Sequence, residues 1–137
     1  DKKLKDVNFL VKHTDFTNEY TNVFSESPEA MEYNAPHHFH VRDAKTDKVL
    51  SEVHFQEGPI KEVGVNGVCN EDLLLMVYTR LDCFQHSDYM CTENEEAMRH
   101  IEEAVKALRS RTNRRKAAGI EGTSATDNSV SEEDKNE

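Results

Sequence analysis

The 137-residue sequence contains no tryptophan, and its aromatic residues make up only 7% of the chain. Its apolar residues amount to 36%, which is below the roughly 45–50% usual for globular domains when glycine is counted. It lacks any run of about 18 apolar residues, the minimum for a membrane-spanning helix. The first residues also lack the apolar core of a signal peptide. We therefore expect a modest core, no membrane span and a cytoplasmic protein.

Cysteine and familiar catalytic motifs are also scarce. The three cysteines are odd in number and widely spaced, which argues against a disulfide framework and for a reducing compartment. No P-loop, GxGxxG or GxSxG motif occurs. A nucleophilic Cys83 or Cys91 with His86 as its base has no supporting motif. We expect no catalytic residue and no cofactor.

Charge is abundant but unevenly distributed along the chain. The formal net charge is −10, yet the stretch from Lys106 to Lys116 holds six basic residues and no acid. An acidic protein with one short cationic patch is a poor binder of duplex nucleic acid. Such a patch suits a small anion held by charge-assisted hydrogen bonds. The alternative is a solvated helix end, where basic side chains complement the helix dipole.

The N-terminal half, about residues 1–66, carries strand patterns. Residues 7–11 alternate weakly, and residues 17–24 form a second candidate strand. Residues 38–42 and 49–56 alternate with a two-residue period on either side of a polar turn at 45–48, which predicts a β-hairpin.

Two helices are predicted over about residues 70–118. Asn70 is a candidate cap for the first helix, and Thr92 with Glu95 forms a candidate capping box for the second. The second helix is expected to stop at Gly119. The short connection favours an antiparallel hairpin. The predicted fold class is α+β, with a small N-terminal antiparallel sheet and a C-terminal antiparallel helical hairpin. We expect one domain over residues 1–123 and a disordered acidic tail at 124–137.

Four residues are candidates for an anion or nucleotide site. Arg111 and Arg115 share one helix face and suit a pyrophosphate. Phe84 is either a stacking platform for a base or a core residue, and Asn94 either reads a polar edge or simply starts a helix. In an antiparallel hairpin Phe84 lies far from Arg115, so a site that uses both forms more naturally between subunits.

The histidines at 37, 38 and 40 suggest a metal cluster at first sight. In a strand, however, His38 and His40 share a face while His37 points away, and no CxxC or HExxH pattern accompanies them. We therefore expect no metal site.

The C-terminal two-thirds of the sequence resembles the phage Thoeris anti-defence "sponge" family, whose helical hairpin is shared with a phage anti-CBASS sponge. The resemblance covers about residues 38–123. It rests on an ordered series of segments: Phe55-Gln56-Glu57-Gly58-Pro59-Ile60-Lys61-Glu62, Gly64-Val65-Asn66-Gly67, Asn70-Glu71-Asp72-Leu73-Leu74, Arg80-Leu81, Phe84-Gln85, Cys91, Glu93-Asn94, Arg111-Thr112, Arg115 and Gly119-Ile120-Glu121-Gly122-Thr123.

The resemblance implies a protein that binds a cyclic ADP-ribose isomer (glycocyclic ADP-ribose) without cleaving it. It thereby blocks activation of the Thoeris effector in the cytoplasm of the infected bacterium. It implies a homo-oligomer, a dimer or a hexamer, with Phe84, Asn94, Arg111 and Arg115 at a subunit interface. A second site for cyclic di- or trinucleotides would use Gly119, Gly122 and Thr123. The sequence departs from the family pattern at Cys83, where glycine is expected, and at 86–88, which replace a Gly-Pro connection.

Two alternatives stay open at this point. The basic helix face suits a protein-interaction module that docks an acidic partner. A cyclic-nucleotide hydrolase would instead use His86 or Cys91.

Overall fold

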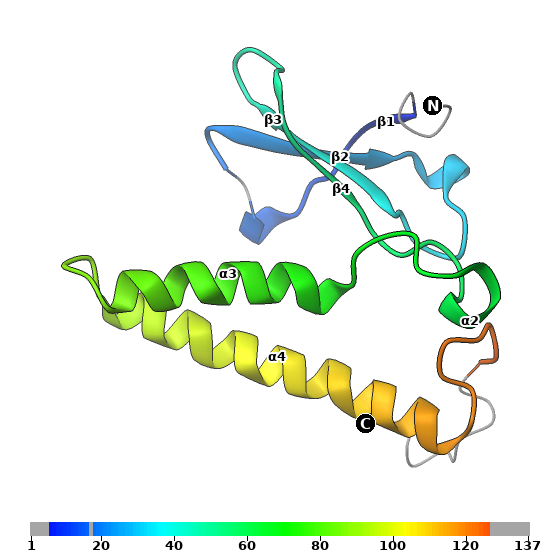
Figure 1. The fold of residues 1–137 in the computed structure, drawn as a ribbon. Helices are drawn as coiled ribbons and strands as arrows, with labels where there is room; N and C mark the ends of the chain where they lie inside the picture. Colours follow the sequence, from blue (N-terminus) through cyan, green and yellow to red (C-terminus); the bar gives the residue numbers. More distant parts are fainter. Residues whose placement is uncertain (1–5, 17, 127–137) are drawn as a thin grey trace. The chain divides into compact units, whose positions relative to one another are not determined.

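The computed structural model describes residues 6–16 and 18–126 and divides the chain into two compact units. The first, called the sheet unit here, comprises residues 1–58 and 65–68, and the second, the helical unit, comprises residues 59–64 and 69–137. The predicted α+β class is confirmed, because an antiparallel sheet precedes a helical hairpin (Figure 1). The single domain over residues 1–123 stays a prediction. Residues 127–137 of the predicted tail lie outside the described residues.

Four antiparallel strands in sequence order make up the sheet. They are β1 (Val7–Leu10), β2 (Thr21–Glu26), β3 (His38–Asp43) and β4 (Val49–His54). Two short 3-10 helices, η1 (Thr14–Phe16) and η2 (Pro28–Ala30), lie in the first two connections. Such a meander needs only local connections, which suits a small unit.

The predicted hairpin of β3 and β4 is confirmed. Its turn forms because Asp43 Oδ1 accepts the backbone N–H groups of Lys45 at 2.8 Å and Thr46 at 2.9 Å. The Thr46 and Lys45 donors hold the pKa of Asp43 below its ordinary value. Asp47 completes the turn with a φ of 64°, a conformation that aspartate tolerates better than most residues.

The prediction of a strand over residues 17–24 is wrong at both ends, since β2 is Thr21–Glu26. Asn18 Oδ1 accepts the N–H groups of Tyr20 at 2.7 Å and Thr21 at 3.2 Å, and so holds the segment before the strand in a turn. At the other end, Ser25 and Glu26 extend the strand although both are polar, because both are buried.

Polar side chains dominate the interior of the sheet unit. Val7 is the single apolar residue classed as buried in the part of the chain that the structure describes, whereas Glu26, His38 and His40 are all less than a tenth exposed. Glu26 Oε1 accepts the backbone N–H groups of His37 at 2.8 Å and His38 at 2.7 Å. Burial alone would raise the pKa of Glu26, but these donors outweigh it and lower the pKa.

The helical unit consists of α2 (Ile60–Val63), α3 (Asn70–Gln85) and α4 (Thr92–Ala117). The predicted antiparallel hairpin of α3 and α4 is confirmed (Figure 1). Gln85 closes the connection, because its side chain donates to the Cys91 carbonyl at 3.0 Å and accepts the Cys91 N–H at 2.9 Å. Gly119 ends the second helix as predicted, with a φ of 74° that favours glycine.

Both predicted helix caps are wrong by one residue. Asn70 is the first residue of α3, and Cys69 precedes it as the cap, with its N–H donated to Asp72 Oδ2 at 2.8 Å. Thr92 is likewise the first residue of α4 rather than its cap. The cap is Cys91, whose N–H donates to Gln85 Oε1, and no side chain caps this helix. The Glu95 N–H donates to the Cys91 carbonyl instead of to Thr92.

Over residues 6–16 and 18–126, the structure contains no helix long and apolar enough to cross a membrane. The apolar side chains of α3 instead lie partly in solvent. None of its residues is fully buried, and Leu75 and Met76 are each about 60% exposed.

Candidate nucleotide site on the helical hairpin

Phe84 lies in an open groove along α3. The groove has a volume of about 820 Å³, within the range of small-molecule sites. It is lined by Asp72, Leu75, Met76, Thr79, Arg80, Cys83, Phe84, Ser87 and Tyr89. Phe84 is 37% exposed, so part of its ring faces solvent. Its two interpretations, as a stacking platform for a base and as a core residue, both stay predictions.

Arg80 and Tyr89 are two groove residues that sequence reasoning missed. The guanidinium of Arg80 lies over the Phe84 ring, 5.3 Å from its centroid, in a cation–π contact. The spacing of four residues between Arg80 and Phe84 places both on one helix face, and this signal could have identified the pair. Tyr89 is 77% exposed in the connection between the helices, where no periodic pattern marks it.

Asn94 lies in the first turn of α4 and is half-buried. The Gln85–Cys91 clamp brings the start of α4 to the end of α3, so Asn94 and Phe84 belong to the same end of the hairpin. An aromatic ring and an amide at one end of the hairpin suit the recognition of a base.

Arg111 and Arg115 lie in the last two turns of α4 and differ in environment. Arg111 is exposed. Arg115 is only 7% exposed, and its Nη2 donates to the carbonyl oxygens of Ile120 at 3.3 Å, Thr123 at 3.3 Å and Ala125 at 2.8 Å. Arg115 therefore organises the backbone that follows the helix, whereas the Arg111 guanidinium faces solvent.

The structure does not bring the four predicted residues together in one chain. Asn94 and Arg111 are separated by about 25 Å along α4, at 1.5 Å per residue. Phe84 shares the Asn94 end of the hairpin, and Arg115 shares the Arg111 end. One chain thus carries the aromatic and amide candidates at one end of the hairpin and the two arginine candidates at the other.

The segment after α4 folds back on α2. Gly122 has a φ of 78°, and its carbonyl accepts the N–H of Lys61 at 2.8 Å. A Cβ at Gly122 would lie 2.9 Å from Lys61 Cγ, so the backbone approaches this side chain closely. The N–H of Ser124 donates to Glu62 Oε2 at 2.9 Å, and the Thr123 hydroxyl donates to the Ile120 carbonyl. The predicted second-site residues Gly119, Gly122 and Thr123 thus form one compact turn beside a lysine.

The cysteines and His86 show no arrangement of an activated nucleophile. All three cysteines are free and exposed. Burial, and then the Asp72 and Glu71 carboxylates, raise the pKa of the Cys69 thiol, which is the opposite of thiolate activation. His86 Nδ1 lies 2.8 Å from the Asp82 carbonyl oxygen, within its own helix end.

The fold and the hairpin define the class of protein. The family model of the Acb2/Tad1 hairpin domain matches residues 47–112. The match includes β4, α3 and the part of α4 that ends at Thr112. This chain is therefore a small α+β protein built around that helical hairpin.

A comparison over most of the chain identifies the family. The chain is 41% identical to Thoeris anti-defense 1 of Bacillus phage SBSphiJ7 over 136 residues, a match that covers 82% of this chain and 96% of the relative. The chain belongs to the Thoeris anti-defense 1 family.

Proposed function

We propose that this protein is a phage anti-Thoeris protein that sequesters the nucleotide signal of that defence system. The observation that carries the proposal is the 41% identity to a protein named Thoeris anti-defense 1 over most of both chains. The finer proposal is that the signal is a cyclic ADP-ribose isomer, glycocyclic ADP-ribose, and that the protein binds it without cleaving it.

The chemistry of the hairpin supports a ligand of this kind. Such a ligand has an adenine base, two riboses and a pyrophosphate with two negative charges. The exposed ring of Phe84 and the amide of Asn94 suit the base. The exposed guanidinium of Arg111 suits the pyrophosphate through charge-assisted hydrogen bonds, and Arg115, which is buried against the following backbone, supports that end of the site. A binder that only sequesters its ligand needs ground-state affinity and no groups aimed at a transition state.

The separation of the aromatic–amide half-site from the arginine half-site supports assembly of the site from two chains. A cyclic dinucleotide-sized ligand does not span about 25 Å along α4. A second chain that packs with its hairpin reversed brings its arginine end to the Phe84 end of the first. The exposed apolar groove of α3, with Leu75 and Met76, offers the surface for this contact. The proposal therefore includes a homo-oligomer, as a dimer or a hexamer.

A second ligand site is proposed at the turn of Gly119, Gly122 and Thr123, for cyclic di- or trinucleotides. Lys61 approaches this turn and supplies positive charge. If the two sites are separate, saturating cyclic trinucleotide leaves the affinity for cyclic ADP-ribose unchanged. Competition between the two ligands contradicts a separate second site.

The test of sequestration is the fate of the ligand. The protein is incubated with a stoichiometric amount of glycocyclic ADP-ribose, the complex is denatured, and the released nucleotide is weighed by mass spectrometry. Recovery of the intact ligand is expected, and recovery of a hydrolysed product would contradict the proposal in favour of an enzyme that uses His86 or Cys91.

The test of the site is Arg111→Ala. Loss of a charge-assisted hydrogen bond costs about 1.5–3 kcal/mol, so binding weakens by about 10- to 100-fold in calorimetry. Arg99→Ala is the matched control, because Arg99 is also an exposed arginine of α4 but pairs with Glu96 at 3.8 Å. If wild type and Arg111→Ala both fail to bind any of the nucleotides, the basic face is instead a protein-docking surface.

A further inference from the structure

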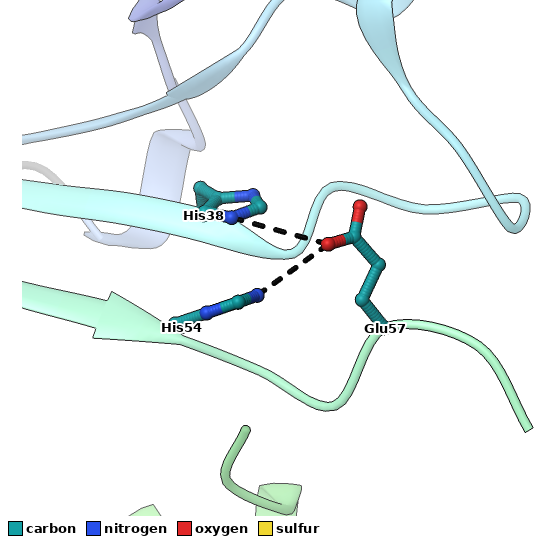
Figure 2. A group of neighbouring side chains, drawn as sticks. All are labelled: His38, His54 and Glu57. Atoms are coloured by element: carbon teal, nitrogen blue, oxygen red, sulfur yellow. Dashed lines mark ion pairs between the residues drawn. The ribbon is translucent and has the colours of Figure 1, made fainter. Parts of the chain in front are cut away.

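Two histidines and a glutamate converge at one end of the β3–β4 hairpin. His38 on β3 lies directly opposite His54 on β4, and Glu57 follows β4 by three residues. Figure 2 shows both imidazole rings directing a nitrogen toward the same carboxylate oxygen. One ligand atom from each of the three residues lies within 4.8 Å of the others. None of these residues belongs to the nucleotide site on the helical hairpin.

The nitrogen–oxygen separations in this cluster are longer than those of typical hydrogen bonds. Glu57 Oε1 lies 4.0 Å from His38 Nε2 and 3.5 Å from His54 Nε2. A neutral imidazole with its proton on Nδ1 presents a lone pair at Nε2. In that tautomer the two Nε2 atoms and the carboxylate oxygen repel one another unless a cation lies between them. Distances of this size fit three ligands around a common ion, whose own bonds are about 2 Å long.

A buried carboxylate orients the His38 ring from behind. Glu26 Oε2 lies 3.4 Å from His38 Nδ1, and both side chains are almost completely buried. A proton on Nδ1 faces the Glu26 carboxylate in this arrangement, and the Nε2 lone pair then faces Glu57. Histidine ligands of metal ions usually donate their other ring N–H to a carboxylate, which fixes the orientation of the ring. Glu26 is held in turn by the backbone N–H groups of His37 and His38.

The segment that carries Glu57 is fixed as well. The Asn66 side chain accepts the Glu57 N–H at 2.8 Å and donates to its carbonyl at 2.7 Å. The neighbouring Gly67 lies so close to Phe55 that a Cβ would be 2.5 Å from its carbonyl carbon. Glu57 is thus positioned by a tight backbone clamp, which reduces the entropy lost when it binds a ligand.

We propose that His38 Nε2, His54 Nε2 and Glu57 Oε1 bind a divalent transition-metal ion, with Zn²⁺ the best fit. Imidazole and carboxylate ligands favour zinc over magnesium or calcium, which prefer oxygen ligands alone. His54 is about half exposed, so the ion enters from solvent and keeps a fourth position for water. The stacked rings, with centroids 4.1 Å apart and an interplanar angle of 25°, converge by a small tilt on binding.

The three histidines that the sequence suggested as a cluster do not form this site. His37 Nε2 contacts the Glu32 carbonyl at 2.8 Å, and His40 faces Glu52 across the sheet at 3.6 Å. Only His38 takes part, and its partners come from the opposite strand and the loop beyond it. The proposal is therefore independent of the proposed nucleotide binding, and its failure would leave that function untouched.

The experiment uses the full chain, stripped with EDTA and exchanged into metal-free buffer. Zn²⁺ titration in a calorimeter is expected to give one ion per chain, and Co²⁺ is expected to give the visible absorption of a tetrahedral site. His54→Ala removes an exposed ligand and abolishes both signals. His100→Ala is the matched control, because His100 is an exposed histidine paired with Glu96 at 3.6 Å and it leaves both signals unchanged.

Two further variants keep the test decisive if His54→Ala perturbs the fold. Glu57→Gln has the shape of the wild-type residue and is expected to abolish tight binding. Glu26→Gln loses only the outer carboxylate and is expected to weaken binding by about 10- to 100-fold. Circular dichroism establishes that each variant is folded. A wild-type chain that binds no Zn²⁺, or a folded Glu57→Gln that binds it as tightly as wild type, would overturn the proposal.

Discussion

The sheet unit hides polar side chains, whereas the helical unit leaves large apolar side chains in solvent. Glu26, His38 and His40 are nearly inaccessible in the former, while Leu75 and Met76 on α3 are each more than 60% exposed. Burying polar groups is unfavourable unless they are hydrogen-bonded or ligated, and exposing apolar groups is unfavourable unless a partner covers them. The two proposals follow this contrast: a cation would ligate polar groups of the sheet unit, and another copy of the chain would cover the apolar groove of the helical unit.

The largest expected effect is on the apolar groove of α3. Leu75→Glu places a charge in the proposed contact between chains, so the oligomer is expected to dissociate completely to monomers in sedimentation velocity. Binding of glycocyclic ADP-ribose is expected to be lost with it, since each chain then keeps two distant half-sites. The free energy of unfolding of the monomer changes by only about 0.5 kcal/mol, because Leu75 is a surface residue.

Val77→Glu is the control for the groove. Val77 is also an exposed apolar residue of α3, but it does not line the groove. Its replacement is expected to leave the oligomer intact. Dissociation by both substitutions would show that the charge on α3, rather than the groove itself, governs assembly.

The next largest effect is expected on the stability of the sheet unit. Glu26→Ala leaves two buried backbone N–H groups without their acceptor, at about 1–3 kcal/mol for each, and removes the carboxylate that lies 3.4 Å from His38 Nδ1. We expect a loss of about 4 kcal/mol in urea unfolding and faster hydrogen exchange at the amides of β2 and β3. Glu29→Ala, at an exposed glutamate of η2, is expected to change neither.

The same comparison explains which parts of the fold could be predicted from the sequence. The β3–β4 hairpin and the two long helices carry regular patterns of apolar residues, and their class and order were predicted correctly. The strand β2 was misplaced because its last residues, Ser25 and Glu26, are polar yet buried, and binary patterning assigns such residues to the surface. Local patterns thus fail where polar groups form the interior.

The helix starts and the candidate site show a second limit. Cys69 and Cys91 are not favoured cap residues, and they cap the helices because Asp72 and Gln85 satisfy their backbone N–H groups. The arginine pair was found from its spacing, but the contacts of Arg115 with three carbonyl oxygens depend on a return of the chain that spacing does not encode. The roles of Phe84, Asn94, Arg111 and Arg115 in binding stay predictions.

A smaller effect is expected on the pH dependence of stability. The pKa of Glu26 is lowered in the folded state, so the carboxylate contributes stability that is present above its ordinary value of 4.5 and is lost as the pH falls below it. We expect the urea midpoint of the wild type to fall between pH 5 and pH 3 more steeply than that of Glu26→Gln, which does not titrate there. Equal slopes for the two proteins would remove Glu26 as a source of acid sensitivity.

The smallest effect is at the end of α4. Gly119 has a φ of 74° with nothing near its missing Cβ, so Gly119→Ala introduces backbone strain without a clash and costs about 1 kcal/mol in the free energy of unfolding. Gly119→Asn is expected to cost less, because asparagine tolerates this conformation. In the sheet unit Gly67→Ala is expected to cost more than Gly119→Ala, because its Cβ would lie 2.5 Å from the backbone of Phe55. An equal loss of unfolding free energy at the two glycines would mean that the backbone near Phe55 moves to accommodate the added Cβ. The contacts that position Glu57 would then be less rigid than the structure indicates.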